Sequence, residues 1–208
     1  MAEELDKVKK EKVGFRERFF ARLGKYLMYW KQKKVSQLLI NLAYREIIRL
    51  LVEVDGNLET ALNTMYTLSS QAGRDFLMEW VQQGSVIFSR FIGDHALWIK
   101  SGYFSFTGDH ITNIRYEAPK KEGDPHRVIW TLDKCFLCSG MDTDKSFKIN
   151  KDEIGELGYG VVIAGIFQMT TNMINEYAGI EFKGTVKETK CLLKGDPYGE
   201  FVAEFYPK

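Results

Sequence analysis

The sequence predicts an α+β fold in which helices pack on one face of a small antiparallel sheet. Three observations predict it. Apolar residues recur at helical spacing through the first half of the chain, two pairs of alternating segments follow residue 110, and one long apolar segment separates those pairs. Runs of helices and of strands, rather than strict strand–helix alternation, favour an antiparallel sheet covered by helices.

Residues 1–35 are expected to form a basic extension that contains an amphipathic helix. They carry eleven Lys or Arg against five Asp or Glu, a net charge of +6, whereas the whole chain carries +1. Between residues 15 and 30, apolar residues recur every three or four positions, as in a helix. The basic residues interspersed along this helix are Arg16, Arg18, Arg22 and Lys25.

This basic helix has two interpretations. Its aromatic and cationic composition is typical of a helix that lies on an anionic membrane surface or contacts an acidic partner, with the four basic side chains as contacts. The favoured alternative is that its apolar side packs on the domain while the charges face water. That apolar side consists of Phe15, Phe19, Leu23 and Leu27. Nucleic-acid binding is not predicted, because no known reader motif accompanies the charge.

The next region predicts two further helices. Ser36 can cap the first of them, and Asp55-Gly56 ends it. Its predicted buried stripe consists of Leu39, Leu42, Ala43, Ile47, Leu50 and Leu51. Asn57 can cap the other, which is expected to run without interruption to Gly84.

The remaining segments alternate between strand and helix signals. A short helix is expected between Gly84 and Gly102. The predicted strands are 111–116, 127–132, 180–193 and 200–205, with a long apolar helix over 152–177 between the two pairs. Asn150 can cap that helix and Gly179 can end it.

Cysteine spacing suggests one candidate metal site. Cys135 and Cys138 can clamp one zinc ion, and a structural site would need further ligands, which Glu188 and Cys191 could supply. Three positions apart on a strand, Glu188 and Cys191 share a face only if a bulge intervenes. The alternative is that the three cysteines are buried apolar groups. Zinc is the only cofactor that the sequence suggests.

Other chemical signals are weak. The glycines at 155, 158, 160 and 165 match no phosphate-binding spacing, and close packing of the following helix is the favoured interpretation. No nucleophile–base or metalloprotease motif accompanies the three histidines, so no catalytic residue is assigned and an enzyme is not predicted. The charged first residues and the absence of a long apolar run predict a cytoplasmic protein, with peripheral membrane contact left open.

Residues 188–201 carry a family resemblance. The pattern Glu-x-x-Cys-x-x-x-Gly-Asp-Pro, followed by an aromatic-ending strand, resembles the closing signature of the 4-vinyl-reductase domain. Segments 41–51, 57–77 and 129–135 resemble the small subunits of the TRAPP membrane-tethering complexes, which belong to the same superfamily. The resemblance makes 36–208 one α+β domain, and its mixed features suggest a prokaryotic, archaeal homologue.

The resemblance implies two functions. One is a non-enzymatic scaffold or tethering subunit, which forms a homodimer or joins related subunits and acts near a membrane or a small GTPase. The other is a sensor that binds an apolar small molecule, with or without zinc, in a pocket lined by Val161, Ile163, Phe167 and Met169.

The chain departs from both patterns. Zinc-binding sensors of the family have a cysteine at the position of Gly199, and one kind of TRAPP subunit has an acylated cysteine in the region that corresponds to 80–91. Neither cysteine is present here. The inherited metal site would thus be reduced to Glu188 and Cys191, with Cys135 and Cys138 as substitute ligands.

Overall fold

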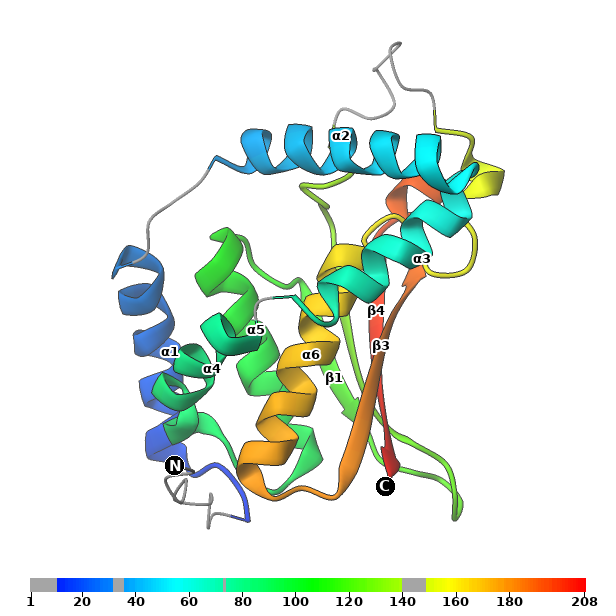
Figure 1. Ribbon diagram of the computed structural model, residues 1–208. Helices are drawn as coiled ribbons and strands as arrows, with labels where there is room; N and C mark the ends of the chain where they lie inside the picture. Colours follow the sequence, from blue (N-terminus) through cyan, green and yellow to red (C-terminus); the bar gives the residue numbers. More distant parts are fainter. Residues whose placement is uncertain (1–10, 32–35, 73, 140–148) are drawn as a thin grey trace.

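The computed structural model describes residues 11–31, 36–72, 74–139 and 149–208. Within them, six helices pack against a four-stranded antiparallel sheet, which confirms the α+β class (Figure 1). The helices are α1 (Phe15–Lys31), α2 (Gln37–Asp55), α3 (Leu58–Ser69), α4 (Arg74–Gln83), α5 (His95–Thr107) and α6 (Val161–Ala178). The strands are β1 (Asn113–Glu117), β2 (His126–Leu132), β3 (Phe182–Lys190) and β4 (Gly199–Pro207), in the order β1-β2-β4-β3.

The sheet has one buried face and one polar face. Alternate residues of β2, β3 and β4 point toward the helices, among them Trp130, Val186 and Phe201, all fully buried. Most residues between them are exposed or half-buried, and Arg127 pairs there with Glu204 at 2.8 Å; Ile129 on this face is buried. This alternation is typical of an antiparallel sheet covered on one side only.

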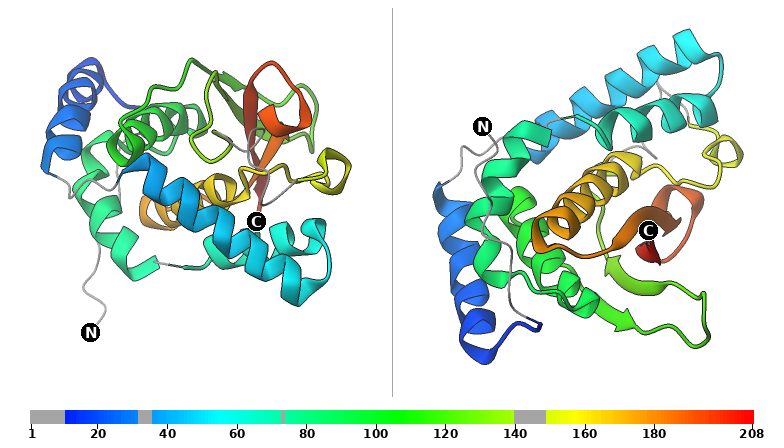
Figure 2. Two further views of the ribbon diagram at one scale, coloured as in Figure 1. Left: turned by 90° about the horizontal axis from the view of Figure 1, so that it is seen from above. Right: turned by 60° about the horizontal axis from the view of Figure 1, so that its bottom comes forward.

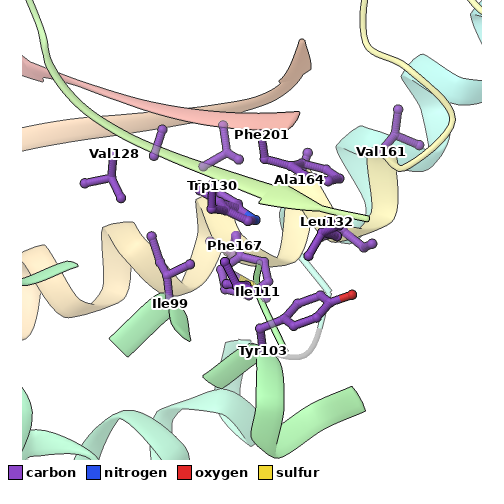
Figure 3. Packing of buried hydrophobic residues seen from close by; sticks show 14 of the residues in the cluster. Ile99, Tyr103, Ile111, Val128, Trp130, Leu132, Val161, Ala164, Phe167 and Phe201 are labelled. Carbon is purple, nitrogen blue, oxygen red and sulfur yellow. The ribbon is translucent and has the colours of Figure 1, made fainter. Parts of the chain in front are cut away.

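Helix α6 lies along the buried face and contributes Phe167 to its centre. The Phe167 ring packs against Trp130 of the sheet and Trp98 of α5, with centroids 5.5 and 5.4 Å away (Figure 3). Ile99 and Tyr103 of α5 and Ile111 belong to the same cluster of buried residues, so the core joins the sheet, α6 and α5 (Figure 3).

Three amide side chains of α6 also cover the edge of β3. The Gln168 Oε1 accepts from the Val186 N–H at 3.1 Å, and Asn172 both donates to and accepts from the Gly184 backbone at 2.9 and 2.8 Å. Asn175 donates to the Phe182 carbonyl at 3.0 Å. These bonds satisfy an edge strand that would otherwise be open to pairing with another chain.

The long helix is shorter than predicted. Residues Lys151–Glu153 form a separate 3₁₀ turn capped by Asn150, and α6 begins only at Val161. Gly155 and Gly158 between them have positive φ angles of 69° and 76°, which a continuous right-handed helix does not allow. Its buried residues include polar ones such as Thr171 and Asn175, so α6 is not apolar throughout.

Two other helix boundaries also differ from the prediction. The expected single helix from Asn57 to Gly84 is two helices, α3 and α4. At the end of α3 the Ser69 and Ser70 hydroxyls donate to the Tyr66 and Thr67 carbonyls, a competition with backbone bonding that weakens helices. Conversely, α5 is a full 13-residue helix that continues through Gly102, where only a short one was expected.

The most informative differences concern which sides of α1 and α2 are buried. On α2, the side chains that face the core are Asn41, Tyr44 and Ile48. The predicted buried stripe is exposed from Leu39 to Leu50, whereas its last member, Leu51, is half-buried against the core. On α1, the favoured interpretation is also wrong. Phe15, Phe19, Leu23 and Leu27 are more than half exposed, while Ala21 and Lys25 are buried. Both helices therefore turn apolar surface to water.

Candidate functional site

A β-bulge at the end of β3 brings Glu188 and Cys191 to the same side. The pairing register of β3 with β4 shifts between Glu188 and Lys190, as the sequence spacing required. Both side chains are buried, and the Cys191 N–H is held by the Asp196 carboxylate at 2.7 Å. The Gly-Asp-Pro turn thus fixes the position from which the Cys191 thiol enters the core.

Cys135 and Cys138 meet this pair from the segment after β2. The Cys138 N–H donates to the Cys135 carbonyl at 3.1 Å, which makes a tight turn and turns both thiols inward. Side-chain hydrogen bonds link Cys138 to Cys135 and to Cys191, and Cys191 to Glu188. The structure therefore gathers all four residues named as candidate metal ligands in one buried group, called here the thiol–carboxylate cluster.

A glycine-rich loop covers the carboxylate of this cluster. The Gly160 N–H donates to Glu188 Oε2 at 2.6 Å. A Cβ atom at Gly158 would lie 2.1 Å from Glu188 Oε2, so only glycine allows the loop to approach so closely. At Gly165 a Cβ would lie 1.9 Å from Ser69 Oγ of α3. The close-packing interpretation of these glycines is confirmed.

Burial and mutual contact set the protonation of the cluster. Burial raises the pKa of Glu188 well above its usual range, and the neighbouring Cys191 raises it further. The hydrogen bond from Cys138 lowers the pKa of Cys191 to about 6, helped by the Tyr159 N–H, which lies 3.5 Å from its sulfur. Glu188 Oε1 is buried and accepts no hydrogen bond within the described residues.

The cluster has the donors of a zinc site without its geometry. Three thiols and a carboxylate suit zinc, and the unpartnered Glu188 oxygen offers a lone pair. Yet in the part of the chain that the structure describes, no three His, Cys, Asp or Glu side chains are placed so that they could hold a metal ion. As they stand, the four side chains form a chain of hydrogen bonds, and zinc binding stays a prediction.

An apolar cavity of about 410 Å³ lies beside the cluster, between the start of α2 and helices α4, α5 and α6. Ile163 and Phe167 line it, as proposed from the sequence, whereas Val161 and Met169 are buried elsewhere in the core. The sequence did not identify the opposite wall, which includes Tyr103 and Phe106 of α5. The aromatic residues of this segment were the available signal, but its helix was underestimated.

The four basic residues of α1 have different environments. Arg18 forms an ion pair with the buried Asp94 at 2.6 Å, and Lys25 is buried beside α5. Arg16 and Arg22 are exposed.

None of the described helices is long and apolar enough to span a bilayer.

No family model matches the chain, and no curated protein matches it significantly. Solved structures do. One is a trafficking protein particle complex subunit 3 from Naegleria fowleri, covalently bound to palmitic acid, at 16% identity and a TM-score of 0.60 over 85% of this chain and 99% of that one. Another is the phenol-responsive sensory domain of the transcription activator PoxR with phenol, at 13% identity and a TM-score of 0.54 over 83% of this chain and 76% of that one.

These similarities show a TRAPP-like fold. They lend no support to the narrower 4-vinyl-reductase assignment or to an archaeal source. At 13% and 16% identity, neither similarity transfers a function to this chain.

Proposed function

We propose that this chain is a non-enzymatic scaffold subunit of the TRAPP type that assembles with a second copy of itself through α2. The fold similarity supports the scaffold class. The observation that carries the proposal is the exposed outer face of α2. The residues of this face are Leu39, Ala43, Ile47, Leu50 and Val54.

The outer face of α2 is apolar over the full length of the helix. Leu39, Leu50 and Val54 are 58%, 52% and 81% exposed, and their spacing places them in one stripe. A helix of 19 residues is about 28 Å long, enough to provide much of an interface of standard size. Continuous apolar surface of this extent on a soluble chain marks an interaction site.

Charges beside this stripe favour a like partner. Arg49 pairs with Glu46 at 2.9 Å and with Glu53 at 3.1 Å, and Arg45 pairs with Glu46 at 3.7 Å, so two positive and two negative groups are interspersed along the edge of this helix. A second α2 packed antiparallel would bring these opposite charges together rather than repel them. A related subunit with a similar apolar helix would fit the same face.

Light scattering at tens of micromolar tests the assembly. We expect the wild type to have a dimer mass, and the double variant Leu39→Glu/Leu50→Glu to be a monomer with an unchanged circular dichroism spectrum. Leu68→Glu, on the exposed end of α3, is the matched control and should stay dimeric. A wild type that remains a monomer alone would count against self-assembly, and binding to a related subunit would redirect the proposal to a heteromer.

A second function, binding of an apolar small molecule, is favoured by the cavity beside Phe167. Its walls are largely apolar, and its volume of about 410 Å³ is within the range of ligand pockets. The Tyr103 hydroxyl is buried at its wall without a hydrogen bond of normal geometry among the described residues, so it can serve one polar atom of a ligand. All three cysteines of the chain lie in the thiol–carboxylate cluster, and the ligand is therefore proposed to bind without a covalent bond.

Mass spectrometry of small molecules released from purified protein tests this second function. We expect an apolar compound in stoichiometric amount from the wild type and none from Ile166→Trp, which fills the cavity from α6. Val202→Trp, on the outer face of the sheet, is the control for added bulk. Equal amounts from both variants would show that the compound binds elsewhere.

A further inference from the structure

We propose that the hollow between α1 and α5 seats the headgroups of anionic phospholipids and lays the aromatic side of α1 on a membrane surface. This inference goes beyond the proposed function and does not depend on it, since it rests on α1 and α5 and not on the outer face of α2.

All the charged side chains that line the hollow are basic. It encloses about 380 Å³ beside the exposed start of α1. Its lining consists of Phe15, Arg18, Phe19, Arg22 and Lys25 from α1 and Leu97, Lys100 and Ser101 from α5. Four of these eight residues are cationic and none is acidic. The α1 residues follow helical spacing, so they form a single stripe along the helix.

Most of this positive charge is not neutralised within the protein. Arg18 is paired with Asp94, but Arg22, Lys25 and Lys100 form no salt bridge in the part of the chain that the structure describes. Lys25 is only 9% exposed, with its Nζ 4.9 Å from the centres of the Tyr26 and Phe104 rings. Burial, followed by repulsion from Lys100 and Arg22, lowers its pKa. An anion in the hollow would relieve that repulsion.

Aromatic and aliphatic side chains continue from the rim of the hollow along α1. Phe15 and Trp30, near the two ends of the helix, are 86% and 77% exposed, and Phe20, Leu23 and Leu27 between them are more than half exposed. Large aromatic side chains beside Lys and Arg are the composition of helices that lie in the headgroup region of a bilayer.

α1 is fixed in a position from which it can reach a flat surface. The Asp94 carboxylate accepts from the Val13 N–H at 2.7 Å, from Arg18 at 2.6 Å and from the Ser89 hydroxyl at 2.7 Å. Tyr26 and Tyr29 pack their rings on Phe104 of α5 at 4.9 and 5.2 Å. Figures 1 and 2 show α1 at the edge of the molecule opposite the sheet, where no other described element covers its outer side.

Charge decides between a membrane and other occupants of this face. A second copy would place the same unpaired cations against each other, which disfavours self-assembly through α1. An anionic bilayer offers phosphates to the hollow and an apolar layer to Leu23 and Leu27, so one surface satisfies both features. A nucleic acid would satisfy the cations and leave the aliphatic side chains exposed.

Vesicle flotation with the full chain tests the inference. The probes are vesicles of phosphatidylcholine alone and of phosphatidylcholine mixed with phosphatidylserine. We expect binding only to the mixture, weaker at high salt, and about fivefold weaker for each charge removed in Arg22→Gln/Lys100→Gln. Lys183→Gln/Lys187→Gln, on the polar face of β3, removes the same charge and should bind like the wild type. Phe15→Ala should weaken binding to the same vesicles without changing its salt dependence.

Two results would overturn the inference. One is equal binding to both kinds of vesicle, or none to either. The other is an equal loss in the hollow variant and in the control variant, which would reduce the effect to net charge. Tight binding of a DNA or RNA duplex in place of the mixed vesicles would assign the hollow to a nucleic acid. Neither pair of substitutions lies on α2, so we expect the mass measured by light scattering to stay the same in both variants. Failure of the membrane test therefore leaves the assembly through α2 standing.

Discussion

The contacts of the Glu188 carboxylate explain why the loop before α6 contains glycine and why β3 contains a bulge. Its Oε2 takes the Gly160 N–H at 2.6 Å, and the place of a Gly158 Cβ is already occupied by the carboxylate. The loop before α6 must therefore carry glycine, and the same carboxylate requires a bulge in β3 to meet Cys191. The pattern around Glu188 and Cys191 therefore reflects how the loop, the bulge and the carboxylate pack together, and the same side chains are the candidate zinc ligands.

A comparison of Gly158 with Gly195 distinguishes the cost of a steric clash from the cost of backbone strain. Both have positive φ angles, 76° and 98°, but a Cβ at Gly195 meets nothing within 4 Å. We expect Gly195→Ala to lower the free energy of unfolding by about 1 kcal/mol from strain alone. Gly158→Ala should lower it by about 3 kcal/mol or more, because the carboxylate must also move. Urea unfolding of both variants measures the difference, and equal losses would contradict the close approach.

His95 predicts a pH dependence of stability. Its Nε2 lies 2.9 Å from Asn175 Oδ1, and burial lowers its pKa from 6.5 to about 4. Between these values the unfolded chain binds the proton and the folded chain does not, so the free energy of unfolding falls as pH falls from 6.5 to 4. The loss attributable to His95 is about 3 kcal/mol.

Urea unfolding over this pH range measures it. We expect the extra loss to be absent from His95→Gln and present in His110→Gln, which replaces an exposed histidine. The same pH slope in the wild type and His95→Gln would show that other groups cause it.

Gly199 is the place where a missing zinc ligand can be restored. A Cβ there would lie 3.8 Å from Glu188 Oε1 and 3.7 Å from the Leu132 carbonyl, both ordinary contacts, so a larger residue fits. We expect Gly199→Cys to raise zinc affinity by roughly tenfold or more, since it adds a thiol beside the carboxylate. Val202→Cys adds a thiol on the opposite face and is the control. Titration against a coloured zinc chelator measures both, and equal affinities would exclude a site at this position.

At the level of elements, the sequence predicted most of the helices and all four strands. It did not predict which side of α1 or α2 faces the core. On α2, apolar residues occur on two sides, and periodicity cannot tell which one meets the core. The structure buries the side with Asn41 and Tyr44, because Asn41 donates to the Phe136 and Leu137 carbonyls at 2.7 and 2.9 Å. That polar tether is a tertiary contact, which local patterning does not contain.

Of the candidate site, the thiol–carboxylate cluster could be predicted from the sequence, but the full lining of the cavity could not. The cysteines and Glu188 could be grouped, because one bulge is enough to align residues three apart on a strand. The cavity could not be completed, since its second wall belongs to α5, whose length depends on packing around Trp98 and Tyr103. The amides of α6 that cover β3 are Gln168, Asn172 and Asn175, and they recur at helical spacing. That spacing places them on one side of the helix but does not indicate that they bond to a strand.

Across the whole molecule, the apolar surfaces divide into two kinds. The sheet presents a mostly polar outer face, and side chains of α6 bond to the backbone of its edge strand β3. Pairing of another strand with this edge is therefore disfavoured. The exposed apolar residues gather instead on α1 and α2. On α1 they accompany positive charge that, among the described residues, is neutralised only at Arg18. On α2 they accompany charges of both signs, so the two helices suit different partners.

Native mass spectrometry of the full chain purified from cells tests the central claim, assembly through α2, most directly. The account predicts a complex of twice the 24.0 kDa chain mass that dissociates to monomers in Leu39→Glu/Leu50→Glu. Any retained apolar compound would appear as added mass on the same species. A wild type found only at 24.0 kDa, under conditions in which known dimers of similar affinity stay intact, would contradict it.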